Sequence, residues 1–182
     1  MNSTELPVRV AHFARPFRST PQGARLARHM CAEQLDTWGV PYGSDAHDVL
    51  RLVIAELCAN AVQHGHVPGR DFHVRLTIDT PAFSTSLLEP PTATELPDSA
   101  SATAVATTST VRIEVTDTRA ERLPAPGPAD ASPDGEQVDG RGLFIVEAVA
   151  DRWGWTPRAD GPGKTMWAEY TVTEPAPVAS IG

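Results

Sequence analysis

Three polar side chains recur at every fourth position in one stretch of the sequence: Glu56, Asn60 and His64. On a helix, this spacing stacks all three along one side as a polar ridge. A carboxylate and an amide are costly to bury unless each has a partner. The ridge therefore either faces a ligand or forms a structural network with its own side chains and nearby backbone.

A second candidate feature is a pair of glycines, Gly140 and Gly142, which open an apolar segment from Asp139 to Ala150. Glycine lets a ligand approach the backbone closely, and the free N–H groups of a first helical turn suit phosphate oxygens. Helix starts also need small residues for packing. The pair thus indicates either a phosphate contact or a close helix contact.

The stretch from Val49 to His66 must position the ridge. Its apolar residues recur at intervals of three and four, as on a helix face that packs on a core: Leu50, Ile54, Leu57 and Ala61. Between Val49 and Val62 the only charged residues are Arg51 and Glu56. We therefore expect this helix to be buried around most of its circumference, with Ser44 or Asp45 as its cap.

The remaining pattern predicts one earlier helix and several strands. A helix is expected after Ser19-Thr20-Pro21, ending at Gly39. Alternating apolar and polar residues predict strands, and the last two of these are expected to form a closing hairpin: 8–17, 72–79, 111–117, 153–155 and 165–172.

Three segments have the composition of irregular chain. Residues 80–110 are dominated by Thr, Ser, Ala and Pro and contain no Lys, Arg or Gly, which predicts a flexible insertion in a hairpin connection. Residues 118–139 are rich in Pro, Asp and Gly and are long enough for a mobile lid. The tail, 174–182, is expected to be disordered.

Overall composition narrows the class of protein. At 182 residues the chain fits one domain, and a net charge of -8 with a pI near 5.1 disfavours nucleic acid as a direct partner. No apolar run is long enough for a membrane span, and no signal-peptide segment is evident. Cys31 and Cys58 have no metal-binding pattern. A reduced, cytoplasmic protein is the simplest inference.

The order of these features resembles the Bergerat ATP-binding fold of histidine-kinase-like (GHKL) ATPases. The similarity lies in Glu56-x-x-x-Asn60 on a helix, Asp117 at a strand exit, Gly140-Arg141-Gly142-Leu143 at a helix start and Gly163-Lys164-Thr165 on a strand. Residues 56–65 and 151–155 look most like actinobacterial relatives of anti-sigma-factor serine kinases. The resemblance implies an α+β, two-layer α/β sandwich over residues 8–173, with a mostly antiparallel sheet and helices on one face.

The resemblance also implies roles for the ridge. Asn60 matches the asparagine that holds Mg²⁺ against the phosphates of ATP, and Mg²⁺ does favour oxygen ligands. Glu56 matches the general base, because a carboxylate can accept the proton of an attacking hydroxyl. His64 stands where relatives often place a polar or basic residue near the phosphates.

Other matched residues would bind the rest of the nucleotide. Asp117 matches the aspartate that accepts a hydrogen bond from the adenine amino group, with Thr165 supporting it through water and Gly163 preceding it in the motif. The phosphate side is matched by Gly140, Arg141, Gly142 and Leu143. One departure concerns the family pattern Asp-x-Gly-x-Gly, because residues 117–121 read Asp-Thr-Arg-Ala-Glu and lack both glycines.

Two functional classes follow from the resemblance. The first is a serine/threonine kinase that phosphorylates a small antagonist protein and sequesters a sigma factor. The second is a nucleotide-responsive binding module without phosphotransfer, in which ATP orders the lid. Relatives often dimerise through a sheet edge, so the resemblance allows a homodimer.

Overall fold

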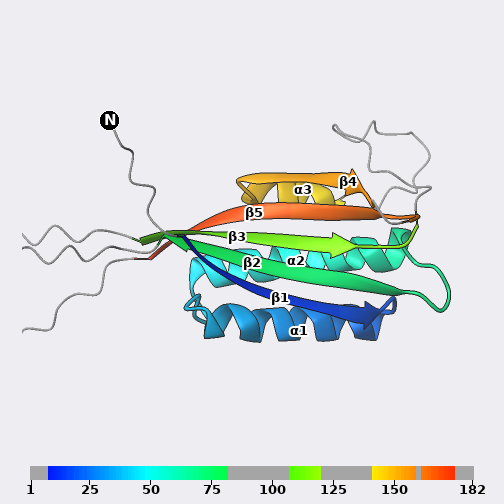
Figure 1. Cartoon of the computed structure of the whole chain (residues 1–182), viewed down its shortest axis with the longest axis horizontal. Helices are drawn as coiled ribbons and strands as arrows, with labels where there is room; N and C mark the ends of the chain where they lie inside the picture. The colour runs from blue at the N-terminus through cyan, green and yellow to red at the C-terminus, as the bar shows by residue number, and fades with distance from the viewer. Residues whose placement is uncertain (1–7, 82–106, 120–140, 159–160, 175–182) are drawn as a thin grey trace, which may run out of the picture.

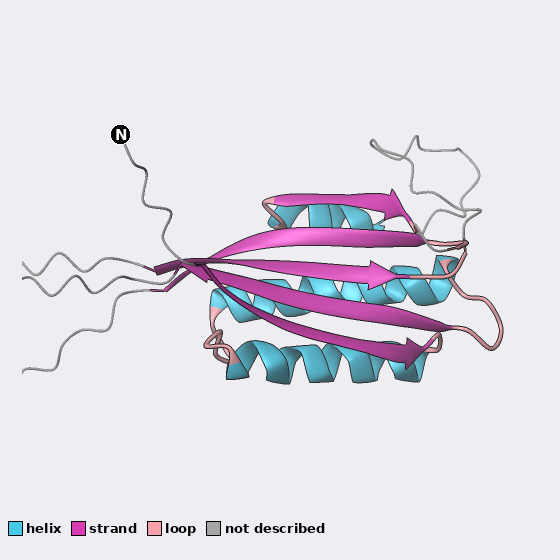
Figure 2. Ribbon diagram, in the orientation of Figure 1, coloured by secondary structure: helices cyan, strands magenta, loops and turns pink. Residues whose placement is uncertain are grey.

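The computed structural model describes residues 8–81, 107–119, 141–158 and 161–174. These residues form a five-stranded sheet with strand order β1-β2-β3-β5-β4 in which all neighbours are antiparallel. Three helices pack along one face of this sheet (Figures 1 and 2). The predicted α+β, two-layer α/β sandwich with helices on one face is confirmed.

The elements follow one another as β1 (Val8–Arg18), α1 (Pro21–Thr37), α2 (Asp45–His64), β2 (Asp71–Pro81), β3 (Thr107–Thr116), α3 (Arg141–Val149), β4 (Arg152–Pro157) and β5 (Lys164–Glu174). The predicted closing hairpin is present, because β4 pairs with β5 and Gly154 lies opposite Trp167. Within the described ranges, no helix is both long enough and apolar enough to cross a membrane.

Strand pairing extends into both ends of the segment predicted as an insertion. Thr80 lies opposite Arg9 of β1, and Thr110 lies opposite Thr171 of β5. The boundaries at 80 and 110 were therefore wrong, because long neighbouring strands offer backbone partners whatever the side-chain composition. β2 and β3 are antiparallel neighbours, as a hairpin connection requires. Residues 82–106 and the tail beyond Glu174 lie outside the described residues.

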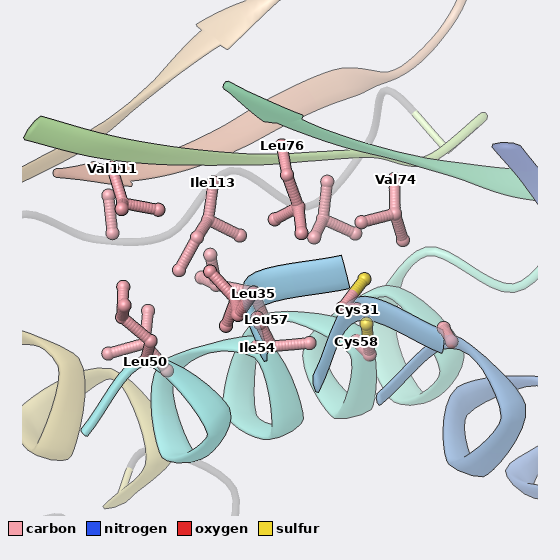
Figure 3. Close-up of a cluster of buried hydrophobic side chains, with 14 of the residues drawn as sticks. Cys31, Leu35, Leu50, Ile54, Leu57, Cys58, Val74, Leu76, Val111 and Ile113 are labelled. Atoms are coloured by element: carbon pink, nitrogen blue, oxygen red, sulfur yellow. The ribbon is translucent and has the colours of Figure 1, made fainter. Parts of the chain in front are cut away.

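The core lies between the sheet and α2. Three inward-facing residues of β2 and β3, Val74, Leu76 and Ile113, are each at most 1% exposed. Figure 3 shows them above Leu50, Ile54 and Leu57 of α2. Alternation along the strands and the three-and-four spacing along α2 thus meet in one apolar layer, as the sequence predicted.

Capping fixes where α2 begins. The Ser44 hydroxyl accepts a hydrogen bond from the backbone N–H of His47 at 3.2 Å. Ser44, rather than Asp45, is therefore the cap. Asp45 and Asp48 lie in the first turn, where their negative charges interact favourably with the positive end of the helix dipole. α2 ends at Gly65, whose backbone N–H donates to the carbonyl oxygen of Ala61 at 3.0 Å.

The sheet face away from the helices carries a ladder of alternating charges. Arg112 donates to Glu114 at 2.9 Å and to Glu169 at 2.6 Å, and Arg152 also pairs with Glu169 at 3.3 Å. The Arg112 guanidinium lies 4.3 Å from the centre of the Trp167 ring. Burial lowers the pKa of Arg112, but its hydrogen bonds to Glu114 and Glu169 outweigh burial and raise the pKa overall.

Candidate functional site

The polar ridge lies on α2 as predicted, and its first member contacts the start of α3. Glu56, Asn60 and His64 are all within α2 and are all partly buried. A Cβ atom built on Gly142 would lie 2.5 Å from Oε2 of Glu56. The Glu56 carboxylate therefore lies directly against Gly142, and a side chain there would have to displace it. The structure thus joins two features that the sequence analysis treated separately.

Asn60 is the member of the ridge with a buried polar atom that lacks a hydrogen-bond partner among the described residues. Its amide nitrogen is buried and forms no hydrogen bond among the described residues. Buried polar atoms are nearly always satisfied in native proteins, so an orphan amide is typical of a position that awaits a ligand. The amide can also turn by half a revolution and present its oxygen instead. The residue therefore fits the oxygen chemistry of Mg²⁺ and of phosphate groups.

The opposite end of the site is built around Asp117, which follows the last residue of β3 and is 2% exposed. Its Oδ2 atom lies 2.6 Å from Nζ of Lys164. Its Oδ1 atom accepts hydrogen bonds from the backbone N–H of Arg119 at 3.1 Å and of Lys164 at 3.4 Å. The carboxylate is thus held by the chain just after β3 and by the first residue of β5.

Two glycines make room for Asp117. A Cβ atom on Gly65, just after α2, would overlap the Asp117 side chain. A Cβ atom on Gly163 would overlap the Asp117 carbonyl oxygen. Gly163 also has a backbone φ of +129°, which residues other than glycine rarely adopt. The end of α2, the end of β3 and the start of β5 therefore meet at Asp117.

These contacts place the two ends of the site along one helix. Glu56 reaches the first turn of α3, while Gly65 touches Asp117. The nine-residue step from Glu56 to Gly65 corresponds to about 14 Å along the helix axis. Asn60 and His64 lie between these two contacts. The site is therefore elongated along α2, with a carboxylate and an orphan amide toward one end and a buried ion pair at the other.

The structure changes the expected partner of Asp117. Thr165 was expected to support it, but the Thr165 hydroxyl lies 2.7 Å from the hydroxyl of Thr116. Successive side chains of a strand point to opposite faces, so Thr165 faces away from the helices, whereas Lys164 faces them together with buried Met166. Lys164, the neighbouring residue, contacts Asp117 in the structure, and the role expected of Thr165 toward the nucleotide stays a prediction.

Sequence reasoning missed Lys164 although two signals could have found it. Met166 and Ala168 are core residues of β5, and the period of two places Lys164 on their face. Lys164 is also the only lysine in the chain. A lone lysine on the apolar face of a predicted strand indicates a specific buried partner.

The remaining predicted site residues are described less fully. Leu143 is partly buried and packs against the core. Arg141 is described only as the first residue of α3, and Gly140 lies outside the described residues, as does the predicted lid except for Thr118 and Arg119.

Two hollows among the described residues lie beside α1 and away from the ridge. One of about 290 Å³, between α1 and α2, is lined by Ala24 and Arg28 from α1 and by Ala55 and Ala59 from α2. These α2 residues are not members of the ridge. In the parts of the chain that the structure covers, no group of three or more His, Cys, Asp or Glu side chains is arranged to hold a metal ion.

Comparison with protein-family models gives a match over most of the chain. A family model described as "Histidine kinase-like ATPase domain" matches residues 17–168, which include every described part of the site. No curated protein matches the chain.

Proposed function

Because the chain belongs to the histidine kinase-like ATPase domain family, we propose that it binds ATP with Mg²⁺ and acts as an anti-sigma-factor serine/threonine kinase. In this proposal it phosphorylates a small antagonist protein in the cytoplasm and sequesters a sigma factor. The family supports ATP binding by a regulatory domain. The kinase activity and the two protein partners go beyond what membership of the family supports.

The observation that carries the proposal is the unpartnered amide of Asn60. It lies one helical turn from Glu56, whose carboxylate is packed against Gly142. Asn60 would hold Mg²⁺, and the bound ion would neutralise charge on the phosphates. The start of α3 is suited to the phosphate end because the first turn of a helix presents free N–H groups.

Glu56 supplies the chemistry that phosphotransfer needs from the protein. Its carboxylate would accept the proton of a serine or threonine hydroxyl on the antagonist. The hydroxyl oxygen would then form a bond to the terminal phosphorus of ATP, and the bond from that phosphorus to the bridging oxygen of ADP would break. In the structure this carboxylate already lies beside Gly142 at the start of α3.

Asp117 would bind the adenine end. An ionised carboxylate only accepts hydrogen bonds, and the adenine amino group donates them. The two backbone N–H groups on Oδ1 fix the orientation of this acceptor. Adenine would therefore be favoured over guanine, which carries an acceptor oxygen in place of the amino group.

The test separates binding from transfer. We expect Asn60→Ala to abolish Mg²⁺-dependent ATP binding in titration calorimetry, whereas Gln63→Ala, an exposed position on the same helix, leaves it unchanged. We expect Glu56→Gln to bind ATP but to lose transfer of labelled phosphate to a candidate antagonist. Unchanged ATP binding by Asn60→Ala would contradict the proposed site.

The absence of both glycines after Asp117 favours a second candidate function. Arg119 and Glu121 stand where the family pattern has glycine and have less backbone freedom, so the lid that follows Asp117 need not close as in kinases of this family. ATP would then order a partner-binding surface without phosphotransfer. Binding of ATP and of a partner, with no labelled phosphate transferred by the unmutated protein, would favour this module.

A further inference from the structure

Lys164 is the only lysine in the chain, and its side chain is 1% exposed. Lysine is almost never fully buried without a partner, because its ammonium loses hydration. The partner here is Asp117, whose side chain is 3% exposed and whose Oδ2 atom lies 2.6 Å from Nζ. Neither side chain of the pair is appreciably accessible to solvent.

This pair uses the acceptor that the proposed function assigns to the base. Both oxygens of the Asp117 carboxylate are engaged, Oδ1 by two backbone N–H groups and Oδ2 by the ammonium. At 3% exposure the carboxylate has no surface left for a ligand of any size. A base amino group can therefore reach Asp117 only if a group that now covers it moves, and the Lys164 ammonium is the one bonded to Oδ2.

We propose that Lys164 is an internal competitor for the base-binding carboxylate, so that nucleotide binding must displace its ammonium from Oδ2 of Asp117. This inference rests on the proposed function, because it assumes that a nucleotide binds at this site. The competition sets affinity: part of the interaction free energy gained by the base is offset by breaking a charge-assisted hydrogen bond.

The same competition sets specificity for the base. A nucleotide whose base offers an amino group replaces one donor on Asp117 with another. A base that presents only a carbonyl oxygen at this place leaves the displaced carboxylate without a donor, which sites of this kind reject strongly. ATP is therefore expected to displace Lys164, and inosine triphosphate is not.

The first experiment compares ATP binding by Lys164→Thr and the unmutated protein in titration calorimetry. Threonine retains one hydroxyl donor and removes the ammonium. We expect about tenfold tighter ATP binding, the order of one charge-assisted hydrogen bond, and no change for inorganic tripolyphosphate, which has no base. Arg112→Thr serves as the control, because it removes an ion pair from the opposite face of the same two strands.

The second experiment uses the unmutated protein, so it does not depend on a variant that folds. Labelling with ¹⁵N-lysine gives a single side-chain ammonium, that of Lys164. Protected by burial, its protons should exchange slowly and give a visible NMR signal. We expect Mg²⁺ and ATP together to abolish this protection, whereas Mg²⁺ with inosine triphosphate leaves the signal unchanged.

The outcomes separate this inference from the proposed function. If ATP binds the unmutated protein while Lys164→Thr binds it equally or more weakly, or while the ammonium signal stays protected, Lys164 is no competitor and nucleotide binding stands. If neither protein binds ATP in calorimetry, the proposed function is refuted together with this inference. Tighter binding by Lys164→Thr with loss of ammonium protection supports both.

Discussion

Ion pairs lie on both faces of the sheet near β3 and β5, and the two sets differ in their exposure to water. Toward the helices, Asp117 and Lys164 are at most 3% exposed. On the open face, Arg112 and Glu169 are 32% and 18% exposed and belong to a ladder that includes Arg152 at 73%. An exposed ion pair is weak because water competes with it, whereas a buried pair is costly to break. The same chemistry should therefore have unequal consequences on the two faces.

The largest expected effect is at the buried pair. Lys164→Met would leave the Asp117 carboxylate buried without its charged partner, and we expect the free energy of unfolding to fall by about 3–5 kcal/mol. Chemical denaturation measures this directly. A loss no greater than that of a variant on the open face would show that burial does not distinguish the two sets of charges.

The glycine beside the buried pair should be the next most sensitive position. Gly163→Ala forces a side chain onto a φ of +129° and against the Asp117 carbonyl oxygen, and we expect a loss of about 1–3 kcal/mol. Gly161→Ala is the matched control, because its φ of +143° is equally unusual but no atom lies near the added methyl group. Equal melting temperatures for the two variants would contradict the close contact at Gly163.

On the open face, Glu169→Gln removes the negative charge that Arg112 and Arg152 share, while one side-chain oxygen remains as an acceptor. Because this face is accessible to water, we expect a loss of only about 0.5–1 kcal/mol, which should shrink at high salt. Losing one acidic hydrogen-bond partner should also lower the pKa of Arg112, since Glu169 is one of the two groups that raise it. A loss independent of salt would argue against an electrostatic origin.

The smallest effect is expected at the exposed end of the ladder. Arg152→Ala removes a guanidinium that is 73% exposed and pairs with Glu169 at 3.3 Å. We expect a change in unfolding free energy within about 0.5 kcal/mol. Thermal unfolding at low salt would check this, and a change as large as that of Glu169→Gln would mean that Arg152 anchors the ladder.

Features set by local sequence patterns could be predicted, whereas contacts between distant segments could not. The sandwich, the ridge on α2 and the place of Asp117 follow from periodicity and from the order of motifs, both of which are local properties of the chain. The contact between Glu56 and Gly142 does not, because it joins two helices that lie far apart in sequence. Strand ends at Thr80 and Thr110 were missed because neighbouring strands, rather than their own side chains, extend the ladder.

Lys164 shows the limit of motif reasoning most clearly. Its motif directed attention to Thr165, whereas strand alternation places Lys164 on the helix-facing side with Met166 and Ala168. A pattern of residue types identifies a neighbourhood, and the pleat of the strand decides which side chain enters it.

The account depends most on Asn60 serving a bound nucleotide rather than the protein itself. The most direct test measures melting temperature with and without Mg²⁺ and ATP, for the unmutated protein and for Asn60→Ala. A ligand that binds only the folded state at a hundred times its Kd adds about 2.7 kcal/mol of stability. We predict that Mg²⁺ and ATP raise the melting temperature of the unmutated protein and leave that of Asn60→Ala unchanged. An equal rise in both proteins, or none in either, would contradict the account.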